Sequence, residues 1–387
     1  MEHGPLTGIR VIDVTTAVAG PWASTQLAEQ GADVIHIEKV AIRDVMRMTG
    51  AIVGDQSGAF VAMHRNKRSI DLDVRHPEGL EIAHRLVSEA DVFVQNFRPG
   101  VADRIGLGYD VLAALNPELI YLSISGFGAD GPYSDQPVYD PIIQAISGMA
   151  EAQNGDFVKA VVADKTAAMT GANAILAALV ARSNGAGGQH VEVNLLDSML
   201  SWMWLEVFWN ESIPDATTTP TYSDWYSPYD TKDGQIAANW TNVKQLRAAC
   251  TALGRPELAD DPRFATRENR IRYADDQRAE FSAILAEMTR DDAIAALRAQ
   301  DVACAPVLAR HEIFDDPQVI HNKTIIEAEH PVAGRTRTVR PPARFSKTPS
   351  VIHRHSPSKG EHTDEVLIAL GYSSEDLEAL RSKGTIA

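Results

Sequence analysis

The first 38 residues contain the feature that most restricts the fold: a strand, a helix and a second strand in direct succession. The first strand is the β-branched apolar run from Gly8 to Val14, and the second covers Asp33 to Glu38. Between them, Pro21 suits the first turn of a helix that continues from Trp22 to Gln30. Because such a unit joins parallel neighbours through a right-handed crossover, the chain begins a parallel sheet.

Later segments repeat this alternation. A helix from Pro77 to Glu89 leads into a strand from Asp91 to Gln95, and further strands cover Leu119 to Ser125 and His190 to Asn194. We therefore expect an α/β protein whose large domain is a Rossmann-like, doubly wound sheet. Ligands of such sheets bind outside the carboxyl ends of the strands, so the loops that follow the strands are the candidates for a site.

Composition limits the partners. The chain has 387 residues and a formal net charge of −16, which argues against non-specific binding of nucleic acid. Its two cysteines provide neither a disulfide framework nor a metal cluster, and they suit a reducing compartment. We see no secretory signal and no apolar run long enough to span a membrane. We expect a cytoplasmic protein without a metal ion or a membrane partner.

Changes in composition divide the chain into parts. Residues 1–205 form the large domain, and the Thr-rich stretch 206–226 is a linker. Residues 227–310 form a smaller α/β domain with a hairpin that turns at Asp233-Gly234. Residues 311–387 return to the large domain. Within these parts we expect helices at residues 242–253, 275–300, 364–370 and 374–382, a strand at 304–308 and a second linker at 332–358.

Loops near the predicted strand ends carry groups that suit a nucleotide with phosphates. Residues 16–20 are small, which lets the backbone approach a ligand closely. Residues 65–69 (Arg-Asn-Lys-Arg-Ser) form a dense basic run. An amide, an aromatic ring and two arginines follow the strand 91–95, namely Asn96, Phe97, Arg98 and Arg104. Arginines bind phosphates through paired hydrogen bonds, so these loops predict an anion site.

The stretch from Gly126 to Gly131 matches G-x-G-x-x-G directly after a strand. A dinucleotide fingerprint has to open a helix, because the pyrophosphate lies on the N-terminus of that helix. Here Pro132 and a turn-rich segment follow instead, so we predict a loop and neither NAD nor flavin. The glycines more simply form a tight wall of another pocket.

Two carboxylates lie at the heads of helical segments. Asp164 precedes a long Ala-rich helix that runs to Arg182, and Asp140 begins the helix from Tyr139 to Met149. Asp is a favoured N-cap, so structural caps are one interpretation. A nucleophile or an acid/base pair is the other, and the order of the chain does not decide whether the two side chains meet.

The helix from Leu195 to Trp209 carries three tryptophans, Trp202, Trp204 and Trp209. We expect them to pack against the protein rather than to stack on a ligand.

These residues together resemble the family III CoA-transferases, which include formyl-CoA transferase and carnitine CoA-transferase and have α-methylacyl-CoA racemase as an isomerase branch. The similarity runs over nearly the whole chain. Each matching segment is short and weakly specific, but so many segments in the same order are a specific signal. The matching segments are residues 5–13, 19–21, 31–38, 66–73, 96–100, 123–128, 304–307 and 360–363.

The resemblance implies a reaction and its residues. Asp164 occupies the position of the family's nucleophile, which takes CoA from an acyl-CoA and passes it to a carboxylic acid through anhydrides and an aspartyl-CoA thioester. Gly126 and Gly128 would line a pocket that keeps water from the anhydrides. The family's fold implies a homodimer of interlocked ring-like subunits. The family's coenzyme A site maps onto Ala17, Val18, Lys39, Arg75, Asn96, Phe97 and Arg104.

Two departures from the family matter. The racemase branch has a His before the position of Asp140, and this chain has Tyr139, so a two-base racemase lacks one partner. The stretch 219–226 has no glycine where formyl-CoA transferase has a glycine-rich loop, which suggests a different acid, with Trp225 and Tyr226 as an aromatic wall of the acyl pocket. An acyl-CoA racemase or isomerase and a CoA-binding protein without turnover stay as alternatives.

Overall fold

The computed structural model describes residues 4–219 and 227–387. It contains two compact units. The larger consists of the chain up to Leu205 together with His321–Ala387, and the smaller is Glu206–Ile320. Within the described residues, no helix is both long and apolar enough to cross a membrane.

The larger unit is built on a six-stranded sheet in the order β5-β2-β1-β6-β7-β8, and every pairing is parallel. The strand order reverses at the neighbours β1 and β6, which makes their carboxyl ends the switch point of a doubly wound sheet. The predicted parallel α/β sheet is therefore confirmed. The strands are β1 Arg10–Asp13, β2 Asp33–Glu38, β5 Lys67–Asp71, β6 Val92–Gln95, β7 Ile120–Ser125 and β8 Gln189–Asn194.

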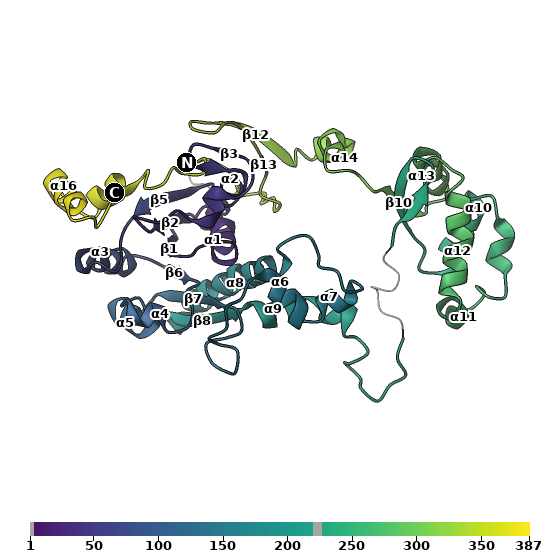
Figure 1. Cartoon of the computed structure of the whole chain (residues 1–387), viewed down its shortest axis with the longest axis horizontal. Helices are drawn as coiled ribbons and strands as arrows, with labels where there is room; N and C mark the ends of the chain where they lie inside the picture. Colours follow the sequence, from purple (N-terminus) through teal and green to yellow (C-terminus); the bar gives the residue numbers. More distant parts are fainter. Residues whose placement is uncertain (1–3, 220–226) are drawn as a thin grey trace. The chain divides into compact units, whose positions relative to one another are not determined.

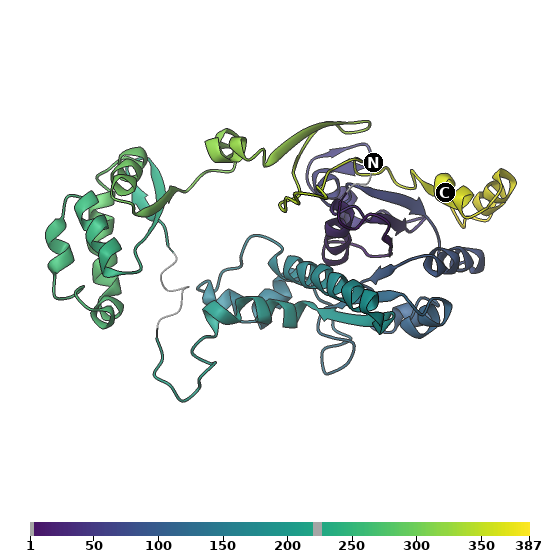
Figure 2. The same cartoon turned by 180° about the vertical axis from the view of Figure 1, so that it is seen from behind.

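Helices cover both faces of this sheet (Figures 1 and 2). On one face, α1 (Ala19–Glu29) packs against α8 (Val162–Ala181), and Gly171 of α8 lies against Leu122 of β7. On the other face, Phe93 and Tyr121 belong to a hydrophobic core shared with helices from the N-terminal and the C-terminal parts of the chain. These helices are α3 Pro77–Ser88, α5 Tyr109–Leu115, α15 Thr363–Ala369 and α16 Ser374–Ser382.

The C-terminal segment is fastened to the edge strand β5. The N–H of His362 donates to the carbonyl of Ser69 at 2.9 Å, and the N–H of Asp71 donates to Thr363 Oγ1 at 3.0 Å. Part of the predicted linker 332–358 is wrong, because β12 (Ile325–His330) and β13 (Gly334–Val339) form an antiparallel hairpin. Gly334 at the start of β13 has φ +68°, a conformation that a glycine adopts freely.

Shorter elements complete the larger unit. The hairpin of β3 (Ile52–Val53) and β4 (Gln56–Ser57) follows a 3-10 turn at Val45–Met48. The remaining helices are α2 Gly58–Met63, α4 Val101–Arg104, α6 Asp140–Ile146, α7 Met149–Ala152 and α9 Leu195–Val207, and α14 Pro317–His321 lies at the boundary between the units.

Helix α9 does not bury its tryptophans. Trp202 and Trp204 expose 56% and 45% of their surfaces, and Leu205 exposes 70%. The prediction that these tryptophans pack against the protein is therefore wrong for Trp202 in the single chain.

The smaller unit has a three-stranded antiparallel sheet, β9 (Tyr229–Thr231), β10 (Gly234–Asn239) and β11 (Ala303–Pro306). The predicted hairpin is confirmed, but its turn consists of Lys232 and Asp233, because Gly234 already pairs with Thr231 as the first residue of β10. The predicted helix 275–300 is wrong as one element, because the side chain of Thr289 accepts the N–H of Asp292 and starts a new helix. The helices of the unit are α10 Val243–Ala252, α11 Arg267–Arg272, α12 Ala274–Leu285 and α13 Arg290–Ala299.

Candidate active site

Two predicted loops meet at the switch point of the sheet. Asn96 follows β6, and its side chain bridges to the loop that follows β1. Its Oδ1 accepts the N–H of Thr16 at 3.0 Å, and its Nδ2 donates to the carbonyl of Thr16 at 2.8 Å. The structure thus brings Asn96 and the neighbouring Ala17 together at one edge of the sheet, where a doubly wound fold binds its ligands.

The loop after β1 has an unusual backbone. Ala17 adopts φ +63°, which lies in the left-handed region that side chains other than glycine rarely occupy. Val18, which is buried, follows and leads into α1. Phe97, on the other side of the switch point, is half-buried against the core that contains Phe93.

Asp164 is the third residue of α8 and not its N-cap, so the capping interpretation is wrong for this residue. The residue at the cap position, Val161, provides no side-chain oxygen. Burial and then the neighbouring charge of Asp140 raise the pKa of Asp164 to about 6, against a smaller lowering by the backbone N–H of Ala19. The carboxyl group of Asp164 therefore lies beside the first residue of α1, next to the switch-point loop.

Asp140 supplies the missing cap. Its Oδ1 accepts the N–H of Ala163 at 2.6 Å and that of Asp164 at 3.4 Å, while its Oδ2 accepts Nε2 of Gln144 at 2.6 Å. Asp140 is only 4% exposed. The structure thus places the two carboxylates together, which chain order left open, and it favours a positioning role for Asp140 over proton transfer because both of its oxygens are occupied.

Gln144 was not found from the sequence. Its Oε1 accepts the N–H of Val158 at 2.9 Å, and its Nε2 donates to the carbonyls of Val158 and Ala160 as well as to Asp140. It therefore ties Asp140 to the segment that precedes α8. Its position one helical turn after Asp140 was the available signal, because residues four apart on a helix face each other.

The two glycines of the predicted pocket wall have different structural reasons. A Cβ atom at Gly126 would lie 2.1 Å from Cγ1 of Val138, so only glycine lets the segment before Asp140 approach β7. Gly128 has φ +113°, and its N–H donates to Oγ of Ser125 at 3.0 Å. The stretch from Gly126 to Tyr139 contains no helix, as the sequence predicted.

Four basic side chains predicted for coenzyme A are exposed, as binding of phosphates requires. Arg75 is held by Asp73, with Nε 3.0 Å from Oδ1. Within the described part of the chain, the side chains of Lys39, Arg98 and Arg104 form no ion pair or hydrogen bond and are available to an anion.

The predicted role of the basic run 65–69 is wrong. Lys67 begins β5 and is completely buried, with Nζ 3.2 Å from Oδ2 of Asp13. The neighbouring arginines are paired as well, Arg65 with Glu29 and Arg68 with Asp33. These charges neutralise acids inside the larger unit and leave nothing for a phosphate.

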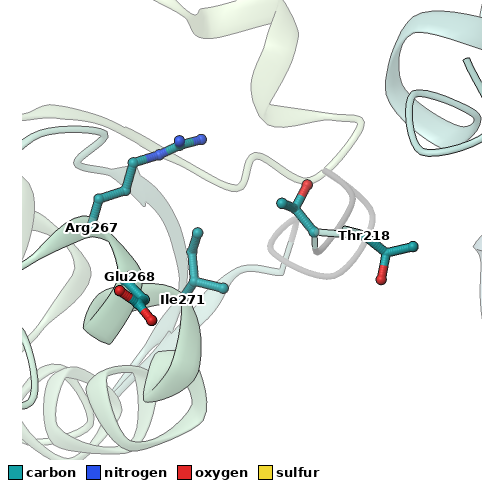
Figure 3. A pocket seen from close by; sticks show the side chains of 5 residues that line it. Thr218, Arg267, Glu268 and Ile271 are labelled. Atoms are coloured by element: carbon teal, nitrogen blue, oxygen red, sulfur yellow. The ribbon is translucent and has the colours of Figure 1, made fainter. Parts of the chain in front are cut away.

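The smaller unit contains a hollow of about 410 Å³, lined by Thr218, Thr219, Arg267, Glu268 and Ile271 (Figure 3). None of the predicted site residues lines it. The predicted aromatic wall, Trp225 and Tyr226, lies outside the described residues.

The fold and the site define a class: an α/β protein with a partly buried carboxylate beside the loops of a switch point. The comparison with known families agrees, because the model of CoA-transferase family III matches residues 6–363. The chain belongs to this family.

Individual relatives and a solved structure resemble the whole chain. It is 35% identical to the succinate–glutarate CoA-transferase of Agrobacterium fabrum, over 95% of this chain and 96% of the relative. It is 32% identical to the succinyl-CoA:glutarate CoA-transferase of Homo sapiens, over 99% of this chain and 90% of the relative. The crystal structure of a CAIB/BAIF family protein from Brucella suis superposes with a TM-score of 0.82 at 30% identity, over 95% of this chain and 100% of the other.

Proposed function

We propose that this protein transfers CoA from an acyl-CoA to a carboxylic acid, with Asp164 as the nucleophile. The observation that carries the proposal is the Asp164 carboxyl group, which lies beside the switch-point loop with a pKa of about 6. A carboxylate with this pKa is largely ionised at neutral pH and needs no base to activate it. The names of the relatives make succinyl-CoA and glutarate the first substrates to test.

The proposed reaction has four steps. The Asp164 carboxylate attacks the acyl carbonyl and expels CoA thiolate, which forms a mixed anhydride. The thiolate attacks the aspartyl carbonyl, releases the donor acid and leaves an aspartyl-CoA thioester. The acceptor carboxylate displaces the thiolate and forms a second anhydride. The thiolate then attacks the acceptor's acyl carbonyl, which releases the new acyl-CoA and restores Asp164.

The surrounding residues have separate proposed tasks. Asp140 holds the first turn of α8 and thereby the backbone of Asp164. Gly126 and Gly128 shape the wall that keeps water from the anhydrides. The coenzyme lies across the switch point, with its chain along Ala17, Val18, Asn96 and Phe97 and its phosphates at Lys39, Arg75, Arg98 and Arg104.

The direct test is the intact mass of the protein after incubation with succinyl-CoA and a hydroxylamine quench. We expect a hydroxamate confined to the peptide that contains Asp164, because hydroxylamine cleaves an acyl anhydride or thioester. Tight binding of CoA without any modification, across a panel of acyl-CoA donors, would overturn Asp164 as the nucleophile.

We expect kcat/KM to follow the ionisation of Asp164. Only the carboxylate attacks, so kcat/KM should rise with pH through about 6 and level off above about 7. The Asp140→Asn variant removes the neighbouring charge and should move this acid limb to lower pH. The measurement is the pH profile of kcat/KM for both proteins. An acid limb that stays in place in the variant would contradict the assigned cause.

We also propose that the enzyme is a homodimer, which the apolar residues exposed in the single chain support. Trp202 and Leu205 lie on α9, and Met169, also exposed, lies on α8. Sedimentation at micromolar concentration should give twice the chain mass of 42.1 kDa. The Trp202→Glu/Leu205→Glu variant should weaken association, whereas Ile368→Glu, on the exposed side of α15, should not. A monomeric wild-type protein would refute the proposal.

A further inference from the structure

Three side chains hold the loop after β1, one from the end of β1 and two from distant parts of the chain. Asp13 Oδ1 accepts the N–H of Thr15 at 2.9 Å, and Asn96 Oδ1 accepts that of Thr16 at 3.0 Å. Asp44 Oδ2 accepts the N–H of Ala17 at 3.1 Å. Three successive backbone donors therefore end on side-chain oxygens, and two of these oxygens, on Asn96 and Asp44, come from outside the loop.

The third of these bonds holds the least favourable residue. Ala17 has φ +63°, where its Cβ crowds the backbone, so the loop would leave this conformation unless a partner held it there. Asp44 is that partner for the N–H of Ala17.

Asp44 is itself rigidly placed. It is 8% exposed, and its second oxygen accepts the N–H of Met46 at 2.7 Å, at the head of the 3-10 turn. The next residue of that turn, Arg47, is buried and donates from Nε to Oε2 of Glu38 at 2.8 Å. The carboxylate of Asp44 is thus connected through the turn to the end of β2.

The conformation of Ala17 has a consequence two residues later. The carbonyl of Val18 accepts the N–H of Trp22 at 2.8 Å and opens α1. The backbone N–H of Ala19, the first residue of α1, lies near enough to Asp164 to lower the pKa of its carboxyl group. The backbone angles at Ala17 set the direction in which α1 starts. They therefore also set where the N–H of Ala19 points relative to Asp164.

We propose that Asp44 is a positioning residue of the transfer reaction: by holding Ala17 in its left-handed conformation, it places the Ala19 N–H against Asp164. The inference rests on the proposed function, because it assumes that Asp164 reacts. Asp44 itself touches no reacting atom.

The test is a double-mutant cycle of Asp44→Ala and Ala17→Gly, assayed with succinyl-CoA and glutarate. Asp44→Ala should lower kcat by about tenfold, because a misplaced site slows a reaction steeply. Glycine adopts a positive φ without strain, so adding Ala17→Gly should restore kcat by about threefold or more in the Asp44→Ala protein, well beyond its effect in the wild type. Asp44→Asn keeps the volume and one acceptor oxygen, and its kcat should fall between those of the wild type and Asp44→Ala.

A matched control removes a similar local cap elsewhere. Oδ1 of Asp316 accepts the N–H of Gln318 at 2.9 Å, as Asp44 does for Met46, and Asp316→Ala should change kcat by less than about twofold. Ala17→Gly effects that are equal in both backgrounds, or a wild-type kcat in Asp44→Ala, would overturn the inference. Failure of the proposed function looks different, because the Asp164→Ala protein would then keep the wild-type rate whatever Asp44 does.

Discussion

The Asp164→Ala protein is expected to lose at least about a thousandfold in kcat and to form no covalent adduct. Every step of the proposed reaction forms or breaks a bond to the Asp164 carboxylate, so no neighbouring group replaces it. Asp140 is close, but its oxygens already accept N–H groups of Ala163, Asp164 and Gln144. Turnover measured with succinyl-CoA and glutarate, together with intact mass, decides the matter.

Asp197 offers a matched control. It is the third residue of α9, as Asp164 is of α8, but its carboxylate accepts Nδ2 of Asn194 at 2.7 Å and is exposed. Asp197→Ala should keep both the adduct and the turnover. An adduct that persists in Asp164→Ala would show that another group is the nucleophile.

The Asp164→Ala substitution should not lower the thermal stability of the protein at neutral pH. A carboxyl group whose pKa is raised by folding favours the folded state only while it is protonated, and this contribution disappears as the pH rises through about 6. At pH 7 the ionised Asp164 therefore costs stability, which alanine avoids. A Tm of Asp164→Ala at least equal to that of the wild type would separate loss of chemistry from loss of fold.

The sheet could be predicted because its signals are local. Short apolar runs such as Val92–Gln95 alternate with helices, and the periodicity alone sets a parallel α/β order. The position of the candidate site was inferred from the same rule, since the loops that carry Ala17 and Asn96 come after adjacent strands.

The relation of Asp140 to Asp164 could not be predicted from spacing. The two residues meet because α6 and α8 pack so that a side chain of one caps the other, which is a tertiary contact across a gap with no regular period. The prediction that Trp202 packs against the protein was wrong for another reason. An apolar helix indicates burial, but it does not indicate whether the covering surface belongs to the same chain.

The basic run 65–69 was wrongly predicted to bind an anion, because a run of charged residues usually indicates a segment exposed to solvent. The missed signal was Asp13, a carboxylate inside the apolar run of β1. A buried carboxylate needs a partner of opposite charge. Lys67, at the start of β5, meets this need.

The Lys67→Met protein is expected to lose about 3–5 kcal/mol of folding free energy, and its Tm should fall by roughly 6–20 °C. Lys67 and Asp13 are both completely buried. Burial by itself would raise the pKa of Asp13, but the charges of Lys67 and His36 outweigh it and hold this pKa well below its usual range. Without Lys67 the carboxylate keeps its charge at a high cost or takes up a proton, and differential scanning calorimetry measures the loss.

Two further proteins show whether the unpaired charge is the cause. The Asp13→Asn/Lys67→Met protein has no buried charge at this position and should be more stable than Lys67→Met alone. Lys383 forms an ion pair with Glu78 at 2.7 Å, and both side chains are about half-exposed. Lys383→Met should therefore cost less than about 1 kcal/mol of folding free energy. If the double variant melts as low as Lys67→Met, the lost packing of the lysine chain is responsible instead.

The pH dependence gives an independent check with a fixed sign. In the wild type, the depressed pKa of Asp13 contributes stability above the pKa of the unfolded chain, and this contribution is lost as the pH falls. In Lys67→Met, a proton on Asp13 removes the unpaired charge, so acid relieves the defect. The difference between the two Tm values should therefore narrow as the pH is lowered from 7.5 toward about 4.5, near the usual carboxyl range. A difference that stays constant would mean that Lys67 stabilises the sheet through its contacts with Ser24 and Pro21 rather than through the charge of Asp13.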